Sequence, residues 1–456
     1  MGFQPVFSVR TKVTPMLPLA SALRYFHKRA PLLLAARKAA VYSGFQTRGE
    51  IEAYQLDRFN EVWADAITNV PYYARIRSEH RLPGRFGSLA ELEAIPYLTR
   101  EILQSQPEEF RRSHPPDSTM RTGGTTGVPL TVGKMKGEGL QTAANVLVGR
   151  LRFGVDFGAR TYLIWGHSHL FGEFPWRWIR MGKRMIGDAV MNYRRKSAYF
   201  LTPDKLHGVF DDMLRWKPSC VIGYSSALVA FASANWARRA EMKACPLRAV
   251  VYTAEPASPQ ARQMLAEFFQ APIVGEYGSL ECGVMAYSTP AGGYRVFWDS
   301  VLLSLDTPEG NTGAAVITSL SPKYTPMIRY KNDDLLIVPD EELHQSSLFA
   351  LSDVVGRAYD VLKFEDGTCI HGIALDACLE LNDWVMQTQV VQRGTRSLTI
   401  RIVASREIGQ AEREMIRGKI TRLHPEFGKA EIEQVQKIDT TVAGKRKWII
   451  RLPEAP

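Results

Sequence analysis

The sequence has few cysteines, and their arrangement argues against two common kinds of site. The 456 residues include five cysteines, an odd number, and no two of them have the CxxC spacing. Such a pattern predicts neither a disulfide framework nor a zinc site. Unpaired thiols are typical of a reducing compartment, so the sequence favours a cytoplasmic location.

The sequence also lacks a long apolar run. Its most apolar N-terminal stretch, residues 15–44, is interrupted by Arg24, Lys28, Arg29 and Lys38, whereas a spanning helix needs roughly 18 apolar residues in succession. We therefore expect no transmembrane segment, and no signal peptide either, because no apolar core leads to a small-residue cleavage site. The stretch is predicted to be a helix packed on the body of the protein, and a basic amphipathic helix at a membrane surface is the alternative.

The charge of the chain does not indicate a nucleic-acid-binding protein. The formal net charge of +10 suits an anionic ligand such as a nucleotide, but the charge is diffuse and no nucleic-acid recognition motif accompanies it. We expect no nucleic-acid partner. Residues 175–196 form a basic and aromatic stretch, which either seats a coenzyme A phosphate or a carrier protein, or is a partly buried, partly solvated face.

Short apolar segments alternate with amphipathic ones through the middle of the chain and predict its fold class. Strands are expected at residues 162–165, 220–224, 249–253 and 273–277, and helices at 140–151, 204–216, 225–240 and 259–269. This alternation predicts an α/β fold with a parallel sheet covered by helices on both faces. Ligands in such folds bind beyond the carboxyl ends of the strands, so we expect a site in the loops that follow them.

The flanking parts of the chain have a different pattern. Residues 1–110 are predicted to be mainly helical, with one helix over 50–75, and strands are expected to dominate from 294 to 338. A separate α+β unit of about 100 residues, a usual domain size, is expected over 356–456. The predicted organisation is an N-terminal domain over 1–355, which includes a β-rich subdomain, followed by this small C-terminal domain.

The segment Arg121–Leu130 has the densest cluster of residues that suit a ligand. Its sequence is RTGGTTGVPL, and glycine allows backbone conformations that are closed to other residues. Successive N–H groups, together with threonine hydroxyls, can form a concave site for phosphate. The segment is not the P-loop of ATPases, because Val128 stands where that loop has lysine. From its own residues it is either an anion-binding loop or a glycine-rich surface turn.

Further motifs occur along the chain in a fixed order. They are Val70-Pro-Tyr-Tyr, Ile95-Pro-Tyr-Leu-Thr, Thr122-Gly-Gly-Thr-Thr-Gly, Ala254-Glu-Pro, Tyr277-Gly-Ser-Leu-Glu, Ile328-Arg-Tyr-Lys-Asn-Asp-Asp, Gly356-Arg-Ala-Tyr-Asp-Val-Leu-Lys and Gly444-Lys-Arg. Together they resemble the adenylate-forming enzymes, in the branch that includes phenylacetate–coenzyme A ligase, capsule-biosynthesis proteins and ligases that adenylylate a deazaflavin coenzyme. The resemblance covers most of the chain. It implies a large N-terminal domain with parallel sheets sandwiched by helices, a β-rich subdomain and a small mobile C-terminal α+β domain.

The resemblance implies an ATP site. The positions that correspond to the nucleotide-binding residues of the family are Thr122, Gly123, Gly124, Thr125, Thr126 and Gly127 for the β- and γ-phosphates, and Ala254, Glu255, Pro256, Glu276, Tyr277, Gly278, Ser279, Asp334 and Arg357 for the rest of the nucleotide. Tyr277 would offer a flat face to adenine, opposite residues 254–256, and Asp334 would offer two acceptor oxygens to the ribose hydroxyls. Without the family, the same residues read as a core tyrosine, a polar turn and a surface arginine.

Two further residues would carry the chemistry. Glu281 matches the family glutamate that coordinates magnesium, a hard ion that prefers oxygen ligands. Lys445 resembles the C-terminal lysine that stabilises the charge developing between the α-phosphate and the attacking carboxylate. Lys447 lies in the same basic run and is the alternative for this role.

The sequence departs from the family pattern at three places. Leu280 stands where the family has a threonine that contacts the α-phosphate, and Ser279 offers a hydroxyl one position earlier. Tyr359 occupies the hinge position, which is commonly aspartate or lysine in the family. Residues 287–299 match the segment in which some relatives bind zinc through Cys and His, and here that segment has neither, so we expect no zinc.

The acid-binding side is less well defined by the sequence. His167 and His169 follow a predicted strand end, and Gly223 and Tyr224 follow another. We expect these four residues to line the carboxylate pocket, because the carboxyl ends of parallel strands meet at one edge of a sheet. Each histidine could equally be a packed or surface residue.

The function predicted by the resemblance is ATP-dependent activation of a carboxylic acid, with aromatic acids among the candidates. The acid would become an acyl-adenylate, pyrophosphate would leave, and coenzyme A or another thiol or amine acceptor would then take the acyl group. Two alternatives stay open. One is a nucleotidylyl ligase whose adenylated molecule is the product; the other is a catalytically impaired nucleotide-binding scaffold, which Leu280 and Tyr359 would suit.

Overall fold

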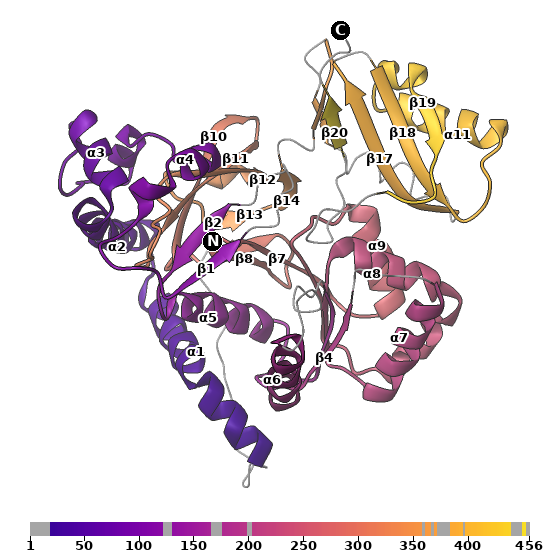
Figure 1. Ribbon diagram of the computed structural model, residues 1–456, viewed down its shortest axis with the longest axis horizontal. Coiled ribbons are helices and arrows are strands. Elements are labelled where there is room, and N and C mark those ends of the chain that lie inside the picture. Colours follow the sequence, from indigo (N-terminus) through magenta and orange to yellow (C-terminus); the bar gives the residue numbers. More distant parts are fainter. Residues whose placement is uncertain are drawn as a thin grey trace.

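The computed structural model of the protein describes residues 19–121, 130–165, 176–197, 203–357, 361–365, 369–371, 384–394, 397–438 and 449–452 (Figure 1). The central sheet consists of β3 (Thr161–Trp165), β4 (Tyr193–Ser197), β5 (Cys220–Gly223), β6 (Ala249–Thr253), β7 (Ile273–Ser279), β8 (Gly283–Ser288), β9 (Tyr294–Val296) and β13 (Ala350–Leu351). Their order in space is β13-β9-β8-β7-β6-β5-β3-β4. The strands from β4 to β7 are parallel, and β8, β9 and β13 extend the sheet in antiparallel fashion.

Helices cover both faces of this sheet, as the sequence predicts. One face packs against α1 (Leu19–Gly44) and α5 (Glu138–Leu151), and the other against α7 (Pro203–Trp216), α8 (Ser225–Ala234), a 3₁₀ helix at Trp236–Ala244 and α9 (Pro259–Phe269). The neighbouring residues Val250 and Val251 are buried in different cores, because successive side chains of a strand point to opposite faces. The predicted α/β fold class is confirmed. Of the helices in the described ranges, none is both long and apolar enough to cross a bilayer.

The helices begin where the local sequence satisfies their first N–H groups. Thr47 precedes α2 (Arg48–Asn69), and its hydroxyl accepts from the N–H of Glu50 while the Glu50 carboxylate accepts from the N–H of Thr47. This reciprocal pair is a capping box. At α9 the Ser258 hydroxyl accepts from the N–H of Ala261, and Pro259 occupies the first turn, where no N–H is needed.

Two helices differ from the expectation. The helix expected over 50–75 divides at Val70, because Pro71 begins a new helix, α3 (Pro71–Glu79), as its first residue. The helix expected over 225–240 is interrupted at Asn235, whose amide nitrogen donates to the carbonyl oxygens of Phe231 and Leu206. Such side-chain bonds to the backbone compete with continuation of a helix.

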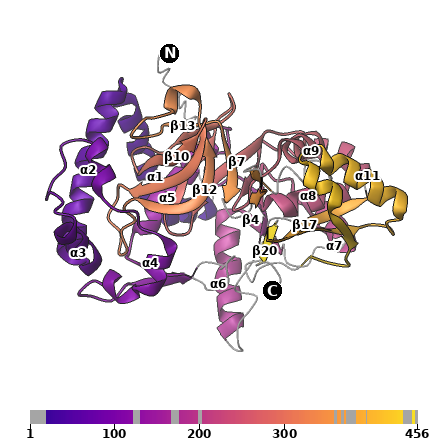
Figure 2. The same cartoon turned by 90° about the horizontal axis from the view of Figure 1, so that it is seen from above.

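A second sheet lies beside the N-terminal helices. It consists of β10 (Val301–Glu309), β11 (Thr312–Ser319), β12 (Tyr330–Ile337) and β14 (Asp353–Arg357), all antiparallel neighbours in that order, and a 3₁₀ helix at Asp340–Glu342 follows β12. The N-terminal helical part also contains 3₁₀ helices at Ala90–Ala94 and Pro107–Phe110 and α4 (Arg100–Ser105). Phe59 and Trp63 of α2 share one buried core with Leu303 and Ile317 of this sheet. Figure 2 shows α2 and α3 on the same side of the molecule as β10.

The motifs Val70-Pro-Tyr-Tyr and Ile95-Pro-Tyr-Leu-Thr form hydrogen bonds with the segment that connects β11 to β12. The Tyr73 hydroxyl donates to the carbonyl oxygen of Pro326 over 2.7 Å. Further along, the Leu98 N–H donates to the carbonyl of Arg329 (3.1 Å), and the Leu98 carbonyl accepts from the N–H of Lys331 (2.9 Å). These motifs therefore hold the chain segment that leads into β12.

The C-terminal part has its own sheet and core. Its sheet has the order β19-β18-β17-β20 and is formed by β17 (Val385–Arg393), β18 (Ser397–Ala404), β19 (Glu431–Gln434) and β20 (Ile449–Leu452). The described elements around it are α11 (Gln410–Thr421), a 3₁₀ helix at Pro425–Lys429 and a hairpin of β15 (Val361–Lys363) and β16 (Cys369–His371). Ile400 and Ile402 of β18 pack on Ile416 and Ile420 of α11.

Candidate active site

Three residues from separate motifs meet at one place. Tyr277 lies on β7, and its hydroxyl donates a hydrogen bond to Oδ2 of Asp334 over 3.1 Å. Asp334 lies on β12 directly opposite Arg357 on β14, and residues in that relation have Cβ atoms about 5 Å apart. The structure therefore brings together the motifs that contain the residues predicted to contact adenine and ribose and the motif of Arg357, which is also predicted to contact the nucleotide. The side chain of Arg357 itself lies outside the described part.

The carboxylate of Asp334 is held in one orientation. Burial and the nearby Asp334 carboxylate raise the pKa of the Tyr277 hydroxyl well above its ordinary range, so this hydroxyl stays protonated and acts as the donor. The amide nitrogen of Asn332 donates to the same carboxylate oxygen, and the N–H of Asp334 donates to Oδ1 of Asn332. Tyr277 is only 6% exposed, so most of its ring is part of the core.

The turn after β6 is fastened to the start of α8. Ala254 has a φ of 68°, in the left-handed region. The Glu255 carboxylate accepts from the N–H and the hydroxyl of Ser226, at 3.1 and 2.6 Å. The carbonyl oxygen of Pro256 accepts from the hydroxyl of Ser225 over 2.6 Å. These contacts fix the segment predicted to face adenine.

Gly223 and Tyr224 lie at the carboxyl edge of the sheet, where the sequence places them. A Cβ atom on Gly223 would lie 3.0 Å from the carbonyl oxygen of Ile164 and from Cγ of Leu228, so this position has little room for a side chain. The ring of Tyr224 packs against that of Trp165 at a tilt of 37°, with 4.4 Å between the ring centroids. His167 and His169 lie outside the described residues.

Glu276 is not brought to the Tyr277–Asp334 group. It lies on the opposite face of β7, beside Thr253 and Tyr287 in the register of the neighbouring strands. Burial raises the pKa of its carboxyl, and Arg150 of α5 acts in the opposite direction. Oε2 of Glu276 and Nε of Arg150 are both buried and have no hydrogen-bond partner among the described residues.

The turn between β7 and β8 carries Glu281 and depends on two glycines. A Cβ atom on Gly278 would lie 2.5 Å from the carbonyl oxygen of Gly283. Gly283 has a φ of +82°, and a Cβ atom there would lie 2.1 Å from Oγ1 of Thr142 on α5. The Ser279 hydroxyl accepts from the N–H of Cys282 over 3.1 Å. Ser279 therefore stabilises the turn.

The surroundings of Glu281 bear on which kind of metal site it could belong to. Glu281 is 6% exposed, and its Oε1 lies 3.5 Å from the hydroxyl of Tyr330. Within the described ranges, no group of three or more His, Cys, Asp or Glu side chains could hold a metal ion. Magnesium is commonly held by one or two carboxylates together with substrate phosphates and water. The residues therefore fit a magnesium ion that arrives with a nucleotide, and they do not form an all-protein cage.

Two paired strands flank the glycine-rich segment in the sequence, one before it and one after it. The two strands are β1 (Ser118–Arg121) and β2 (Thr131–Lys134), and Arg121 pairs with Thr131. The ends of the loop are therefore held side by side. The predicted phosphate-binding residues Thr122–Gly127 lie outside the described part of the chain, as do Tyr359, Lys445 and Lys447.

Two lysines at this site were not found from the sequence. Nζ of Lys323 and Nζ of Lys134 both donate to main-chain carbonyl oxygens in the turn that carries Glu281. A bond to a main-chain oxygen leaves no mark on the residue type at the accepting position. No motif could therefore have indicated these contacts.

Comparison with known proteins shows what the chain and its fold are similar to. Residues 362–452 match the family of the CapK C-terminal domain. The chain is 21% identical over 407 residues to Protein CapK of Staphylococcus aureus, with coverage of 87% of this chain and 88% of that protein. It is 24% identical over 394 residues to phenylacetate-coenzyme A ligase of Thermus thermophilus, with coverage of 80% and 84%. A crystal structure of 2-hydroxyisobutyryl-CoA ligase in the postadenylation state, in complex with an AMP adduct, superposes with a TM-score of 0.69 at 17% identity, covering 89% of this chain and 90% of that chain.

The chain is similar to adenylate-forming enzymes of the branch that includes phenylacetate–coenzyme A ligase and CapK, and it has their fold. The sequence resemblance and the predicted fold of an adenylate-forming enzyme are thereby confirmed. In this adenylate-forming fold, Tyr277 and Asp334 join the central sheet to the second sheet, and Glu281 lies four residues beyond Tyr277.

Proposed function

We propose that the protein activates a carboxylic acid with ATP. The single observation that carries this proposal is the hydrogen bond from Tyr277 to Asp334, with Arg357 directly opposite Asp334. It gathers three positions that the family uses for one nucleotide. Glu281 on the following turn adds a carboxylate that fits magnesium. The net charge of +10 suits the anionic substrate.

Each part of the nucleotide has a proposed partner. The carboxylate of Asp334, oriented by Tyr277 and Asn332, accepts hydrogen bonds from the ribose hydroxyls. Adenine lies between Tyr277 and residues 254–256. Because Tyr277 is 6% exposed, it offers adenine only a small part of its ring, and its larger role is to orient Asp334.

The phosphates are proposed to bind at the hairpin loop. The hydroxyls of Thr122, Thr125 and Thr126 and the glycine N–H groups of the loop hold the β- and γ-phosphates. Glu281 holds magnesium, which neutralises phosphate charge when it is bound. Lys445 stabilises the charge that builds between the α-phosphate and the acid, and Lys447 is the alternative.

The acid is proposed to bind at the carboxyl edge of the sheet, beside Gly223 and Tyr224, with His167 and His169 from the neighbouring loop. A carboxylate oxygen attacks the α-phosphorus, the bond from that phosphorus to pyrophosphate breaks, and an acyl-adenylate forms. An acceptor then attacks the acyl carbon, and AMP leaves. Coenzyme A is the favoured acceptor, because the phenylacetate-coenzyme A ligase relative and the structurally similar 2-hydroxyisobutyryl-CoA ligase are both named as ligases of that thiol; a carrier protein or an amine is the alternative.

Mass spectrometry of the reaction products tests this function. The protein is incubated with ATP, magnesium and a panel of aryl and aliphatic acids in the absence of any thiol. We expect at least one acid to give an acid–AMP adduct, and coenzyme A to consume it. An adduct that is released and survives every added thiol and amine would support the nucleotidylyl ligase. Bound ATP without any adduct would support the scaffold.

A further inference from the structure

We propose that Lys323 and Lys134 are positioning residues for Glu281: they hold the turn that carries its carboxylate by binding the main-chain carbonyl oxygens of that turn. This inference rests on the proposed function, in which Glu281 is the magnesium ligand. Neither lysine belongs to a motif of the family resemblance. Both act on the metal–nucleotide site through the backbone.

The contacts converge on three consecutive carbonyl oxygens. Nζ of Lys323 lies 3.0 Å from the carbonyl oxygen of Glu281 and 3.3 Å from that of Cys282. Nζ of Lys134 lies 3.2 Å from the carbonyl oxygen of Leu280 and 3.3 Å from that of Glu281. An ammonium group has three donors, and bonds from a charged donor are stronger than neutral ones. The carbonyl of Glu281 receives one bond from each lysine.

Lys323 makes these bonds in a place that is costly for a charge. Lys323 is 8% exposed, and burial lowers the pKa of its ammonium group. A lysine is almost never buried to this extent unless its charge is satisfied. The carbonyl oxygens of Glu281 and Cys282 provide that satisfaction, so the fold places a cation directly behind the proposed metal ligand.

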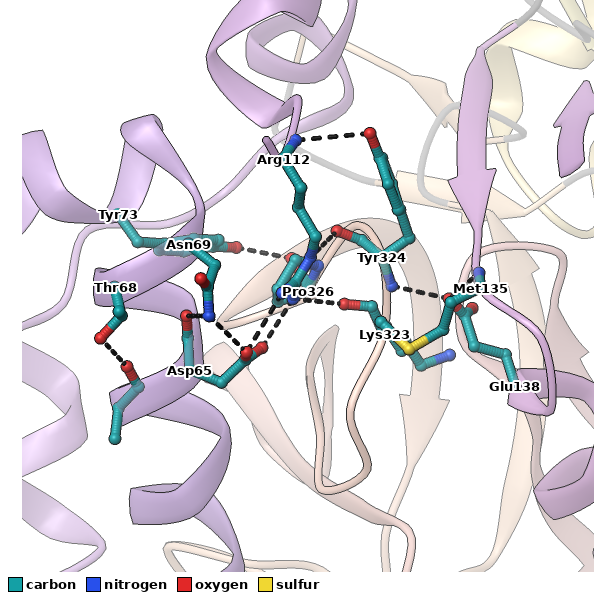
Figure 3. Close-up of polar contacts among 11 residues, drawn as sticks. Asp65, Thr68, Asn69, Tyr73, Arg112, Met135, Glu138, Lys323, Tyr324 and Pro326 are labelled. Atoms are coloured by element: carbon teal, nitrogen blue, oxygen red, sulfur yellow. Dashed lines mark hydrogen bonds and ion pairs between the residues drawn. The ribbon is translucent and has the colours of Figure 1, made fainter. Parts of the chain in front are cut away.

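The backbone that follows the Lys323 side chain is itself fixed by hydrogen bonds. Arg112, which forms an ion pair with Asp65 of α2, donates to the carbonyl oxygens of Lys323 (2.7 Å) and Tyr324 (2.9 Å). The N–H of Tyr324 donates to Oε1 of Glu138 at the start of α5, over 2.7 Å. Figure 3 shows Lys323 and Tyr324 held between Arg112 and Glu138. Lys323 therefore projects from an anchored segment.

The same segment contacts the hairpin that brackets the phosphate loop. The ring of Tyr324 packs on Gly133 of β2, where an added Cβ atom would lie 2.4 Å from Cδ1 of the ring. Lys134 follows Gly133, and its Nζ lies 3.6 Å from Oε2 of Glu138. Oε1 of Glu138 accepts a hydrogen bond from the N–H of Met135 over 2.8 Å. The two lysines thus fix the Glu281 turn relative to the end of the phosphate loop, and a metal ion shared by Glu281 and the phosphates requires that relation.

Nucleotide binding measured with and without metal tests this role. In Lys323→Met the aliphatic stem remains and the ammonium group is lost. We expect the magnesium concentration for half-maximal ATP binding, measured by calorimetry, to rise about tenfold or more, the size seen when partners that orient a metal ligand are removed. ATP binding in the presence of EDTA should be unchanged. Lys323→Arg, which keeps a cationic donor, should restore part of the metal dependence.

Three further variants separate this role from general stability. Lys136→Met removes an exposed lysine from the connection between β2 and α5 and should leave the metal dependence as in the wild type. Lys134 is 13% exposed, and Lys134→Met gives the same test as Lys323→Met if the latter fails to fold. In the double variant Glu281→Gln/Lys323→Met, the magnesium concentration for half-maximal ATP binding should be the same as in Glu281→Gln alone, because both changes act on one unit.

Three results would count against the inference. Wild-type metal dependence in both lysine variants, even with lowered thermal stability, would show that the lysines only stabilise the fold. Additive losses in the double variant would show that Lys323 acts apart from Glu281. Wild-type protein whose ATP binding does not respond to magnesium would instead overturn the proposed function, and the inference with it.

Discussion

The hydroxyl group of Tyr277 donates a hydrogen bond to the carboxylate of Asp334, a residue 57 positions later in the chain, over 3.1 Å. The two residues lie on different sheets, so this bond joins the parallel sheet to the antiparallel one at the proposed ribose site. Asn332 donates to the same carboxylate oxygen. Asp334 is therefore fixed before a nucleotide arrives, which lowers the entropic cost of binding.

Replacing Asp334 should weaken nucleotide binding. Asp334→Asn removes the charge that accepts the ribose hydroxyls, and a hydrogen bond to a charged group contributes about 1.5–3 kcal/mol, so we expect the ATP dissociation constant to rise about tenfold or more. Tyr277→Phe should cause a smaller rise, because Asn332 still orients the carboxylate. Calorimetric titration measures both effects. Asp340→Asn, at an exposed position beyond β12, is the matched control, and equal affinity in Asp334→Asn and this control would contradict the assignment.

The left-handed backbone of Ala254 should make this position sensitive to side-chain shape. Its φ is 68°, a conformation that glycine adopts freely and that β-branched residues avoid. We expect Ala254→Val to lower the free energy of unfolding by about 2 kcal/mol, whereas Ala254→Gly should stay within about 1 kcal/mol of the wild type. Thermal denaturation measures both. Equal stability of the two variants would show that the turn relaxes easily.

The ion pair between Lys38 and Asp299 should be important for stability. The two side chains are 2% and 7% exposed, and the Tyr42 hydroxyl also donates to Asp299 over 2.7 Å. Asp299→Asn leaves a buried ammonium group without its carboxylate, so we expect a loss of about 3–5 kcal/mol in the free energy of unfolding. The exposed pair of Arg85 and Asp57 is the control, and Asp57→Asn should cost only about 0–1 kcal/mol. Similar losses in both variants would contradict the difference in burial.

Alkaline pH should destabilise the protein through its buried tyrosines. Burial raises the pKa of the hydroxyls of Tyr42, Tyr73, Tyr277, Tyr287 and Tyr294 well above 10. In the unfolded chain these groups ionise near pH 10, so above that pH the folded state binds more protons than the unfolded state. The free energy of unfolding should then fall by up to about 1.4 kcal/mol per pH unit for each such tyrosine.

An absorbance titration of the tyrosines measures this effect. Ionisation of part of the tyrosines should coincide with unfolding seen by circular dichroism. Burial lowers the pKa of Lys38 and Lys323, which works in the opposite direction between their folded and unfolded pKa values, but the five tyrosines outnumber them. Complete and reversible ionisation of every tyrosine without loss of structure would contradict the prediction.

The sequence predicts the parallel strands of the central sheet well but misses its edge. Strands β3, β5, β6 and β7 are short apolar runs, because both faces of the sheet are buried. Strand β4 has the sequence YRRKS and was not expected. Its position at the edge permits charged residues, and Arg194 and Lys196 pair with Asp212 of α7. These pairs explain part of the basic stretch at 175–196, whose first portion is α6 (Trp176–Met191).

The sequence predicts the motifs of the site but not the hydrogen bonds that join them. Tyr277, Glu281 and Asp334 are found by their resemblance to a family, but the bond from Tyr277 to Asp334 requires knowledge of how two sheets pack. The contact from Lys134 to Leu280 spans 146 positions and ends on a main-chain oxygen, so no side-chain pattern records it. The separate place of Glu276 could have been foreseen, because neighbours on a strand point to opposite faces.

Acid-dependent exchange between ATP and labelled pyrophosphate tests the central claim most directly, because only reversible attack on the α-phosphorus returns pyrophosphate to ATP. The measurement uses the full chain with magnesium and a panel of aryl and aliphatic acids, and Glu281→Gln and Lys445→Ala serve as impaired variants. The account predicts that at least one acid promotes exchange in the wild type and that both variants bind ATP but exchange far more slowly. If the wild type binds ATP and no acid promotes exchange, the protein is not an acid-activating enzyme and the account is wrong.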